Sequence, residues 1–351
     1  MSRKTYVGYD LGDGETITDL VTLESGKSTT KTFFDNMTMP DTVQPGQAMP
    51  TVFAFDENGD VIFSQTITAD PEAVKDIIVN FKRRPSDLLK EDSPLSVAEQ
   101  IDFIKKSSDW PNASVWADGN SSEMLTFKES VITFTNAIFG DANYINRLKS
   151  AAKDSDEIVF CIGHPTNWTD LDIAIYELIL KNSILGKGKY EGKKSSIIME
   201  AESRAAFLYS KDVESFGRLP KGSSVLLIDV GSSSIDITAM TASSNNHQYN
   251  SGSNYLGARS IDFMIRDWYL KKLQTQPASW SMYQNLVKTN PTVANALTLS
   301  CRRAKEELYS SPKKMSVIHF ALFPGIRLDI KEYLHLLNQK RFTETTNCVR
   351  L

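Results

Sequence analysis

The sequence predicts an α/β protein with two lobes, and three observations support this prediction. The chain has 351 residues, roughly two to three times the commonest size of a single domain. Strands and helices alternate through its middle, a pattern typical of a mixed sheet flanked by helices. A strand that ends in Asp-x-Gly occurs twice, at residues 6–12 and 225–231. These features predict lobes at residues 1–216 and 223–351, joined by a linker at 217–222.

Composition and charge exclude several classes of protein. Hydrophobic residues make up 41% of the chain and charged residues 23%, which excludes a collagenous, low-complexity or disordered protein. A formal net charge of -4 supplies no long-range field for duplex nucleic acid or an anionic membrane, so neither is expected as a partner. The first residues lack the apolar core of a signal peptide, and the three cysteines lie far apart. We therefore expect a reduced, cytoplasmic protein.

The first eighty residues are expected to form mainly strands. Short apolar runs bounded by turn residues predict strands at residues 5–9, 17–23, 51–55 and 61–63. The Asn58-Gly59 step between the last two runs is a hairpin signal. Asp70 followed by Pro71 is typical of a helix start, and apolar residues in 74–81 fall on one helical face. A helix is therefore predicted there.

Alternating elements follow. Apolar periodicity predicts helices at residues 124–149, 169–184, 205–209 and from 331 onward. Between and after them, strands are predicted at residues 157–162, 196–199, 225–230, 235–239, 316–323 and 326–330.

The repeated frame suggests an internal duplication that carries chemistry. In both copies a strand is followed by an aspartate, an apolar residue and a glycine, then by a polar turn and a second strand. The aspartates are Asp10 and Asp229, and the glycines are Gly12 and Gly231. Glycine permits a left-handed or closely approached backbone that exposes N–H groups. Two such turns facing each other would hold a phosphate chain, with the aspartates positioning Mg²⁺.

The order of the motifs resembles the nucleotide-binding domain of heat-shock-protein-70 (DnaK-like) chaperones, within the actin-like ATPase superfamily. Residues 6–16 and 226–237 resemble the two phosphate loops of that family. Further similar segments follow in the family's order at residues 50–55, 80–84, 162–170, 200–206, 255–262 and 301–308. The resemblance implies a duplicated actin-like ATPase (ribonuclease H-like) fold. Far fewer residues follow Asp229 than separate it from Asp10, so we expect an incomplete second lobe without the return strand and the adenosine loop.

The resemblance also implies ligands and roles for individual residues. The implied ligands are ATP or ADP and Mg²⁺, and the implied protein partner is a client or co-chaperone. Asp10, Asp229 and Asp236 would hold the metal shell. Lys82 would reach the γ-phosphate, and Glu202 or Glu200 would orient water. The remaining implied contacts to nucleotide and phosphate are Ser234, Gly12, Asp13, Gly14, Gly231, Ser232, Ser233, Gly257 and Lys305.

The first loop departs from the family pattern of Gly-Thr-Thr, because this chain has Gly12-Asp13-Gly14-Glu15-Thr16, which brings in two carboxylates. Carboxylates beside a triphosphate repel it unless they recruit a cation. Nucleotide binding with slow, Mg²⁺-dependent hydrolysis linked to chaperone-type or regulatory lobe closure is therefore expected. A non-hydrolysing interaction module, an actin-like filament protein and a truncated gene product remain alternatives. Lys82 and Lys305 could equally be solvated helix residues, and Glu200 and Glu202 first-turn acids.

Overall fold

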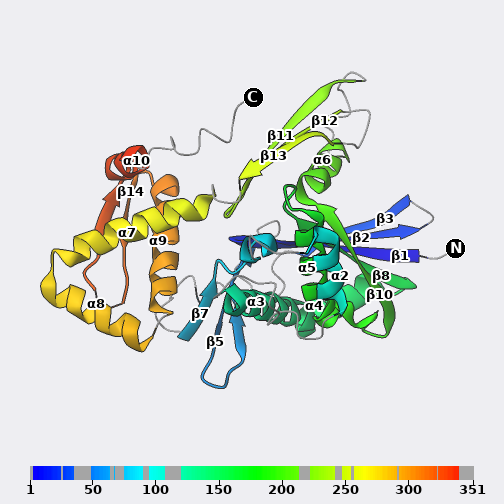
Figure 1. The fold of residues 1–351 in the computed structure, drawn as a ribbon, viewed down its shortest axis with the longest axis horizontal. Helices are drawn as coiled ribbons and strands as arrows, with labels where there is room; N and C mark the ends of the chain where they lie inside the picture. The colour runs from blue at the N-terminus through cyan, green and yellow to red at the C-terminus, as the bar shows by residue number, and fades with distance from the viewer. Residues whose placement is uncertain are drawn as a thin grey trace. The chain divides into compact units, whose positions relative to one another are not determined.

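The computed structural model is a mixed α/β protein (Figure 1). It describes residues 3–24, 27–34, 49–63, 67, 75–89, 95–106, 120–212, 222–241, 247–253, 257–290, 292–321 and 323–339. The chain divides into two compact units. Unit 1 comprises Met1–Thr51 and Phe81–Asn254, and unit 2 comprises Val52–Asn80 and Tyr255–Leu351. Within the described part of the chain, no helix is long and apolar enough to cross a membrane.

The main sheet of unit 1 has the strand order β3-β2-β1-β8-β10-β9, with β4 beside β2. Its strands are β1 (Arg3–Leu11), β2 (Glu15–Glu24), β3 (Lys27–Phe34), β4 (Met49–Pro50), β8 (Glu157–His164), β9 (Lys189–Tyr190) and β10 (Lys193–Ala201). The first three strands are antiparallel, whereas β8 runs parallel to β1 and β10 runs parallel to β8. Asp10 lies near the end of the central strand β1.

Unit 1 contains five helices among its described residues, and α3 packs against one face of β1. The five helices are α2 (Val97–Lys106), α3 (Asn120–Gly140), α4 (Ala142–Ala151), α5 (Asp170–Lys181) and α6 (Glu202–Asp212), with 3-10 turns at Pro85–Leu88 and Ile184–Lys187. Tyr9 of β1 packs edge-on against Phe139 of α3, and its hydroxyl lies 3.2 Å from that of Thr135. The single helix predicted over 124–149 is two helices, because the Asp141 side chain caps α4 by accepting from the Tyr144 N–H.

A second, three-stranded antiparallel sheet in unit 1 contains β11 (Ser224–Val230), β12 (Ile235–Thr241) and β13 (His247–Ser253). Asp229 is paired with Asp236, seven positions on, just as Asp10 is paired with Ile17 in the first hairpin. The two Asp-x-Gly hairpins thus share one register, as the repeated frame leads one to expect. Phe207 of α6 packs against Val225 and Met240.

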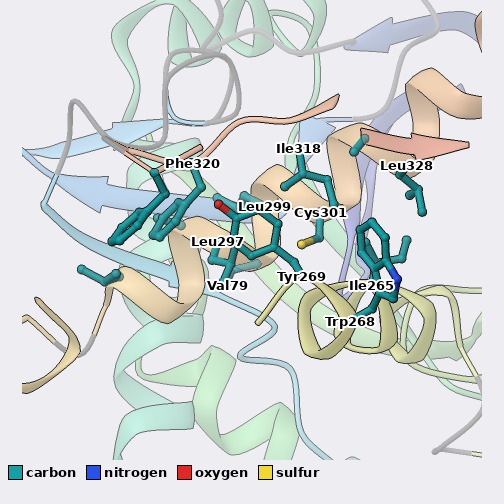
Figure 2. Packing of buried hydrophobic residues seen from close by; sticks show 14 of the residues in the cluster. Val79, Ile265, Trp268, Tyr269, Leu297, Leu299, Cys301, Ile318, Phe320 and Leu328 are labelled. Atoms are coloured by element: carbon teal, nitrogen blue, oxygen red, sulfur yellow. The ribbon is translucent and has the colours of Figure 1, made fainter. Parts of the chain in front are cut away.

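Unit 2 packs helices against two small sheets. Its elements are β5 (Val52–Phe55), β6 (Val61–Phe63), β7 (Lys75–Val79), α7 (Ala258–Gln274), α8 (Pro277–Thr289), α9 (Val293–Ser310), β14 (Met315–Ile318), β15 (Ile326–Asp329) and α10 (Ile330–Gln339). One sheet has the strand order β6-β5-β7, and the other consists of β14 and β15. Figure 2 shows the buried core, in which Val79 of β7 meets side chains of α7 and α9, including Tyr269 and Leu297. The Asn295 amide donates to the Ile77 carbonyl at 2.7 Å, which ties β7 to α9.

The helix predicted to begin at Asp70-Pro71 and to continue through residue 81 is wrong over Lys75–Val79, which form strand β7. Its first residues, 70–74, lie outside the described residues. Residues of β7 pair with β5, for example Val79 with Val52. Asp76 and Asn80 have φ values of 52° and 54°, which no right-handed helix contains. Apolar residues at these spacings fit either structure, and the β-branched run Ile77-Ile78-Val79 favours the strand once β5 offers an edge.

The compact units do not follow the predicted lobe boundaries. Residues 52–80 group with the helices of 255–351, and the hairpin after residue 223 groups with unit 1. The reason for the first regrouping is the burial of Val52, Ile77 and Val79 in the unit 2 core. Most of the predicted linker at 217–222 lies outside the described residues. The two-lobe division at 1–216 and 223–351 therefore stays a prediction drawn from the repeat.

Candidate functional site

The candidate site lies in unit 1 and centres on Lys82, in the segment between β7 and the 3-10 turn at 85–88. Its Nζ donates to Glu202 Oε1 at 3.1 Å, and the residue is only 5% exposed. The ammonium also lies 5.6 Å from the Trp168 ring centroid and 5.8 Å from that of Tyr176, both favourable for a cation. Burial would lower the pKa of Lys82, but the Glu202 and Asp10 carboxylates outweigh it and raise the pKa. Lys82 is therefore a fixed positive charge.

Asp10 and Glu202 approach each other beside Gly163 of β8. A Cβ at Gly163 would lie 3.2 Å from Glu202 Cγ and 3.5 Å from Asp10 Oδ1, so it would be tight against Glu202 and in ordinary contact with Asp10. The surrounding protein desolvates Asp10 and raises its pKa to about 7, with Glu202 adding to the rise and Lys82 opposing it. The Asp10 side chain nevertheless keeps access to solvent. It is therefore a carboxylate that both ligands and protons can reach.

The second hairpin adds Asp229 and Asp236 to the same electrostatic cluster. Burial and then Glu202 raise the pKa of Asp229, while Lys82 lowers it. Asp236, 4% exposed, has its pKa raised to about 6 by burial, then by Glu202 and Asp229. Its Oδ1 atom is buried without a hydrogen-bond partner. An orphaned carboxylate oxygen of this kind is costly unless a cation or water binds it.

The two Asp-x-Gly turns lie against each other. A Cβ at Gly14 would come within 2.7 Å of Ser232 Cβ, so the loops touch at this point. At Gly12 a Cβ would come within 2.3 Å of the Glu15 carbonyl oxygen, and at Gly231 within 3.3 Å of the Ser234 oxygen. The Gly231 N–H donates to that same oxygen at 2.9 Å. Neither Gly12 nor Gly231 is in the left-handed region. Close backbone approach requires glycine at Gly12, whereas the approach at Gly231 is looser.

The charges of the site suit a hydrated divalent cation. The carboxylates that act on one another or on Lys82 are Asp10, Asp13, Glu202, Asp229 and Asp236. Among the residues described, no group of three or more acidic, histidine or cysteine side chains is close enough to chelate a metal directly. Mg²⁺ keeps most of its waters and needs only one or two carboxylates. The residues therefore fit hydrated Mg²⁺ rather than a dehydrated ion in a protein cage.

The remaining predicted residues divide between the two units. Glu202 contacts Lys82, whereas Glu200 pairs with Arg204 at 3.2 Å, so Glu202 is the better supported of the two alternatives. In unit 2, Lys305 Nζ lies 2.6 Å from Asp262 Oδ1. Gly257 is the N-cap of α7, in extended geometry. Lys305 thus neutralises a buried carboxylate, and the nucleotide contacts predicted for it and for Gly257 stay predictions.

Asp172 is a part of the site that the sequence did not reveal. It is fully buried and accepts from Arg84 Nε at 3.0 Å, from the Ser86 N–H at 2.7 Å and from the Thr169 N–H at 2.9 Å. Burial would raise the pKa of Asp172, but hydrogen bonds from Thr169 and Ser86 lower it. Asp172 fastens the segment after Lys82 to α5. The only signal in the sequence is the capping box of Thr169 and Asp172.

No protein-family model matches the chain, and no curated protein matches it. What bears on function is therefore the geometry of this site together with the order of the motifs.

Proposed function

We propose that the chain is an ATP-binding, DnaK-like ATPase-domain protein with an actin-like fold, and that its activity depends on Mg²⁺. One observation carries the proposal. Two hairpins of the same register lie against each other, and their aspartates Asp10 and Asp229 both interact with the Lys82–Glu202 pair. A repeated strand–Asp–Gly turn around one buried lysine has the charges that a metal–polyphosphate ligand requires.

In this proposal each residue acts through its charge or its backbone. Asp10, Asp229 and Asp236 bind the water shell of Mg²⁺, which would neutralise phosphate charge. Lys82 supplies a fixed cation, which phosphoryl transfer uses to stabilise the negative charge spread over the phosphate oxygens. The backbone N–H groups of the two turns are available to phosphate oxygens.

Slow hydrolysis is the part of the proposal that concerns Glu202 and Asp10. Glu202 holds Lys82 and can orient a water beside it. Asp10 would act on the Mg²⁺ water shell beside it, where its carboxylate can accept hydrogen bonds from bound water. Coupling of hydrolysis to a protein client or co-chaperone is proposed on the motif resemblance alone.

A non-hydrolysing interaction module is the second candidate, favoured by Asp13. This carboxylate of the first loop is 3% exposed and adds to the negative charge that acts on Lys82. If Lys82 serves only to balance Asp13, Asp10 and Glu202, no positive charge remains for phosphate.

Calorimetric titration with Mg-ATP tests the proposal. The wild-type chain is expected to bind with saturable heat, and Lys82→Ala is expected to weaken binding at least tenfold. Lys181→Ala is the matched control, because Lys181 is an exposed lysine paired with Glu177 on α5. Phosphate release above that of an Asp10→Asn variant would support hydrolysis. A folded wild-type chain that takes up no Mg-ATP would contradict the proposal, and binding without phosphate release would favour the second candidate.

A further inference from the structure

Among the described residues of unit 1, one face of β11 is exposed, whereas the equivalent face of β1 is buried. The two strands hold the same place in hairpins of the same register. On β1, the side chains of this face are 0, 1 and 0% exposed: Val7, Tyr9 and Leu11. On β11, the side chains at the matching positions are 60, 58 and 66% exposed: Leu226, Ile228 and Val230. Three large aliphatic residues in a row on a strand are not typical of a solvated face.

The structure shows what covers β1. Strand β8 runs parallel along its second edge, with Val7 beside Phe160 and Tyr9 beside Ile162. Helix α5, which follows β8 in the chain, places Tyr176 near Tyr9 of β1: burial and then Tyr176 raise the pKa of Tyr9. Helix α3 adds Phe139. In the described part of the second sheet, β11 pairs only with β12, so its other edge has no strand.

We propose that β11 is a docking edge for a partner polypeptide that contributes a strand followed by an amphipathic helix. The strand would run parallel to β11 and extend its sheet, as β8 does for β1, and the apolar face of the helix would cover Leu226, Ile228 and Val230. This is recognition by strand addition: backbone hydrogen bonds along the edge supply affinity, and the exposed aliphatic side chains select an apolar face. The inference does not depend on nucleotide binding.

The surface area that a stable interface must bury favours a strand–helix unit over a short peptide as the partner. A stable interface buries on the order of 800 Å² per partner. Burying three aliphatic side chains supplies only a few hundred Å² at most, so the partner must also contact the length of the strand edge and bring a second layer.

A second copy of this chain that joins β11 edge to edge would not cover the face. Two β11 strands joined edge to edge in antiparallel fashion, about a two-fold axis perpendicular to the sheet, keep their apolar residues on the same side. Such a dimer would enlarge the exposed patch from three residues to six.

A synthetic peptide of residues 157–181 of this chain is the probe, since it contains β8 and α5, the strand–helix unit that covers β1. Titration of the full chain with this labelled peptide should show saturable binding and slower amide exchange in β11. The triple variant Leu226→Lys, Ile228→Lys, Val230→Lys should lose at least tenfold in affinity while keeping its circular dichroism spectrum. A single variant on the opposite face, Leu227→Lys, is the control and should bind within threefold of wild type.

Three outcomes would overturn the proposal. They are no binding of the peptide to the folded wild-type chain, equal binding to the triple variant, and protection from exchange outside β11. Concentration-dependent dimers of the wild-type chain that disappear in the triple variant would assign the face to a second copy instead. If the triple variant does not fold, amide exchange on the wild-type chain decides by itself.

Discussion

Lys82 is the residue on which the charge balance of the site depends. It is buried among Glu202, Asp10 and Asp13, whose charges outweigh its desolvation. Removing one partner of a buried ion pair leaves the other charge uncompensated and typically costs about 3–5 kcal/mol. We therefore expect Lys82→Met to lower the free energy of unfolding by about that amount, measured by urea denaturation near neutral pH.

The control for this prediction is Lys181→Met. The Lys181 side chain is 52% exposed in its pair with Glu177, and exposed pairs of this spacing are worth less than about 0.5 kcal/mol. Equal stability of Lys82→Met and wild type would mean that the carboxylates do not depend on this lysine.

Asp236 predicts a pH dependence of stability. Its pKa is raised from 3.8 to about 6, so the folded state holds the proton more tightly than the unfolded state does. The contribution of Asp236 to the free energy of unfolding therefore falls as pH rises from about 4 to 6 and is constant above that range. Asp236→Asn removes this loss and should stabilise the chain by roughly 2 kcal/mol at about pH 8, but not at about pH 3.

Asp56 supplies a control, because its pKa is shifted in the opposite direction to that of Asp236. The backbone N–H of Asp60 holds the pKa of Asp56 below its usual value. Asp56→Asn should therefore give no gain in stability at high pH. If Asp236→Asn shows the wild-type pH profile of unfolding, the buried carboxylate of Asp236 is not the source of that dependence.

Among the elements, the two hairpins differ in how closely their backbones approach. A Cβ at Gly12 would come within 2.3 Å of a carbonyl oxygen, a distance that forces the backbone to shift, whereas at Gly231 the nearest oxygen lies 3.3 Å away. Overpacking of this kind costs about 1–3 kcal/mol. Gly12→Ala should therefore destabilise the chain by about that amount, measured by thermal unfolding, and Gly231→Ala by clearly less. Equal effects of the two substitutions would contradict the difference in geometry.

The elements also show which parts of the fold can be predicted from sequence. The strand–Asp–Gly hairpins were predictable because alternation and turn residues are local properties. Strand β7 was not, because its pairing with β5 decides between two structures that its spacing fits equally well. The choice between Glu200 and Glu202 depends on β10 ending at Ala201 and α6 beginning at Glu202, a boundary that sequence patterns locate only to within a few residues.

The other site residues that the sequence did not predict are held by contacts between segments far apart in the chain. Asp172 meets Arg84 and Ser86 across more than eighty residues of chain, and no local pattern encodes such a contact. Lys82 itself was predicted only through a motif resemblance, since a lysine after an apolar residue is ordinarily solvated.

At the scale of the whole molecule, both copies of the repeat form the same hairpin. The sheets to which the two hairpins belong differ in size. In unit 1 the first hairpin continues into a seven-stranded sheet, whereas the second belongs to a three-stranded one. What the two copies share is the pair of aspartates that interact with Lys82 and Glu202. We propose that both copies together bind one metal–nucleotide ligand.

A double-mutant cycle in calorimetric titrations with Mg-ATP tests this claim most directly. If Asp10 and Asp229 act on one hydrated Mg²⁺, Asp10→Asn and Asp229→Asn should each weaken binding at least tenfold. The double variant should then lose less than the sum of the two single losses, because one ion is shared, and a metal chelator should abolish wild-type binding. Mg-ATP affinity that is unchanged in both single variants, or a folded wild-type chain that binds no Mg-ATP, would contradict the account.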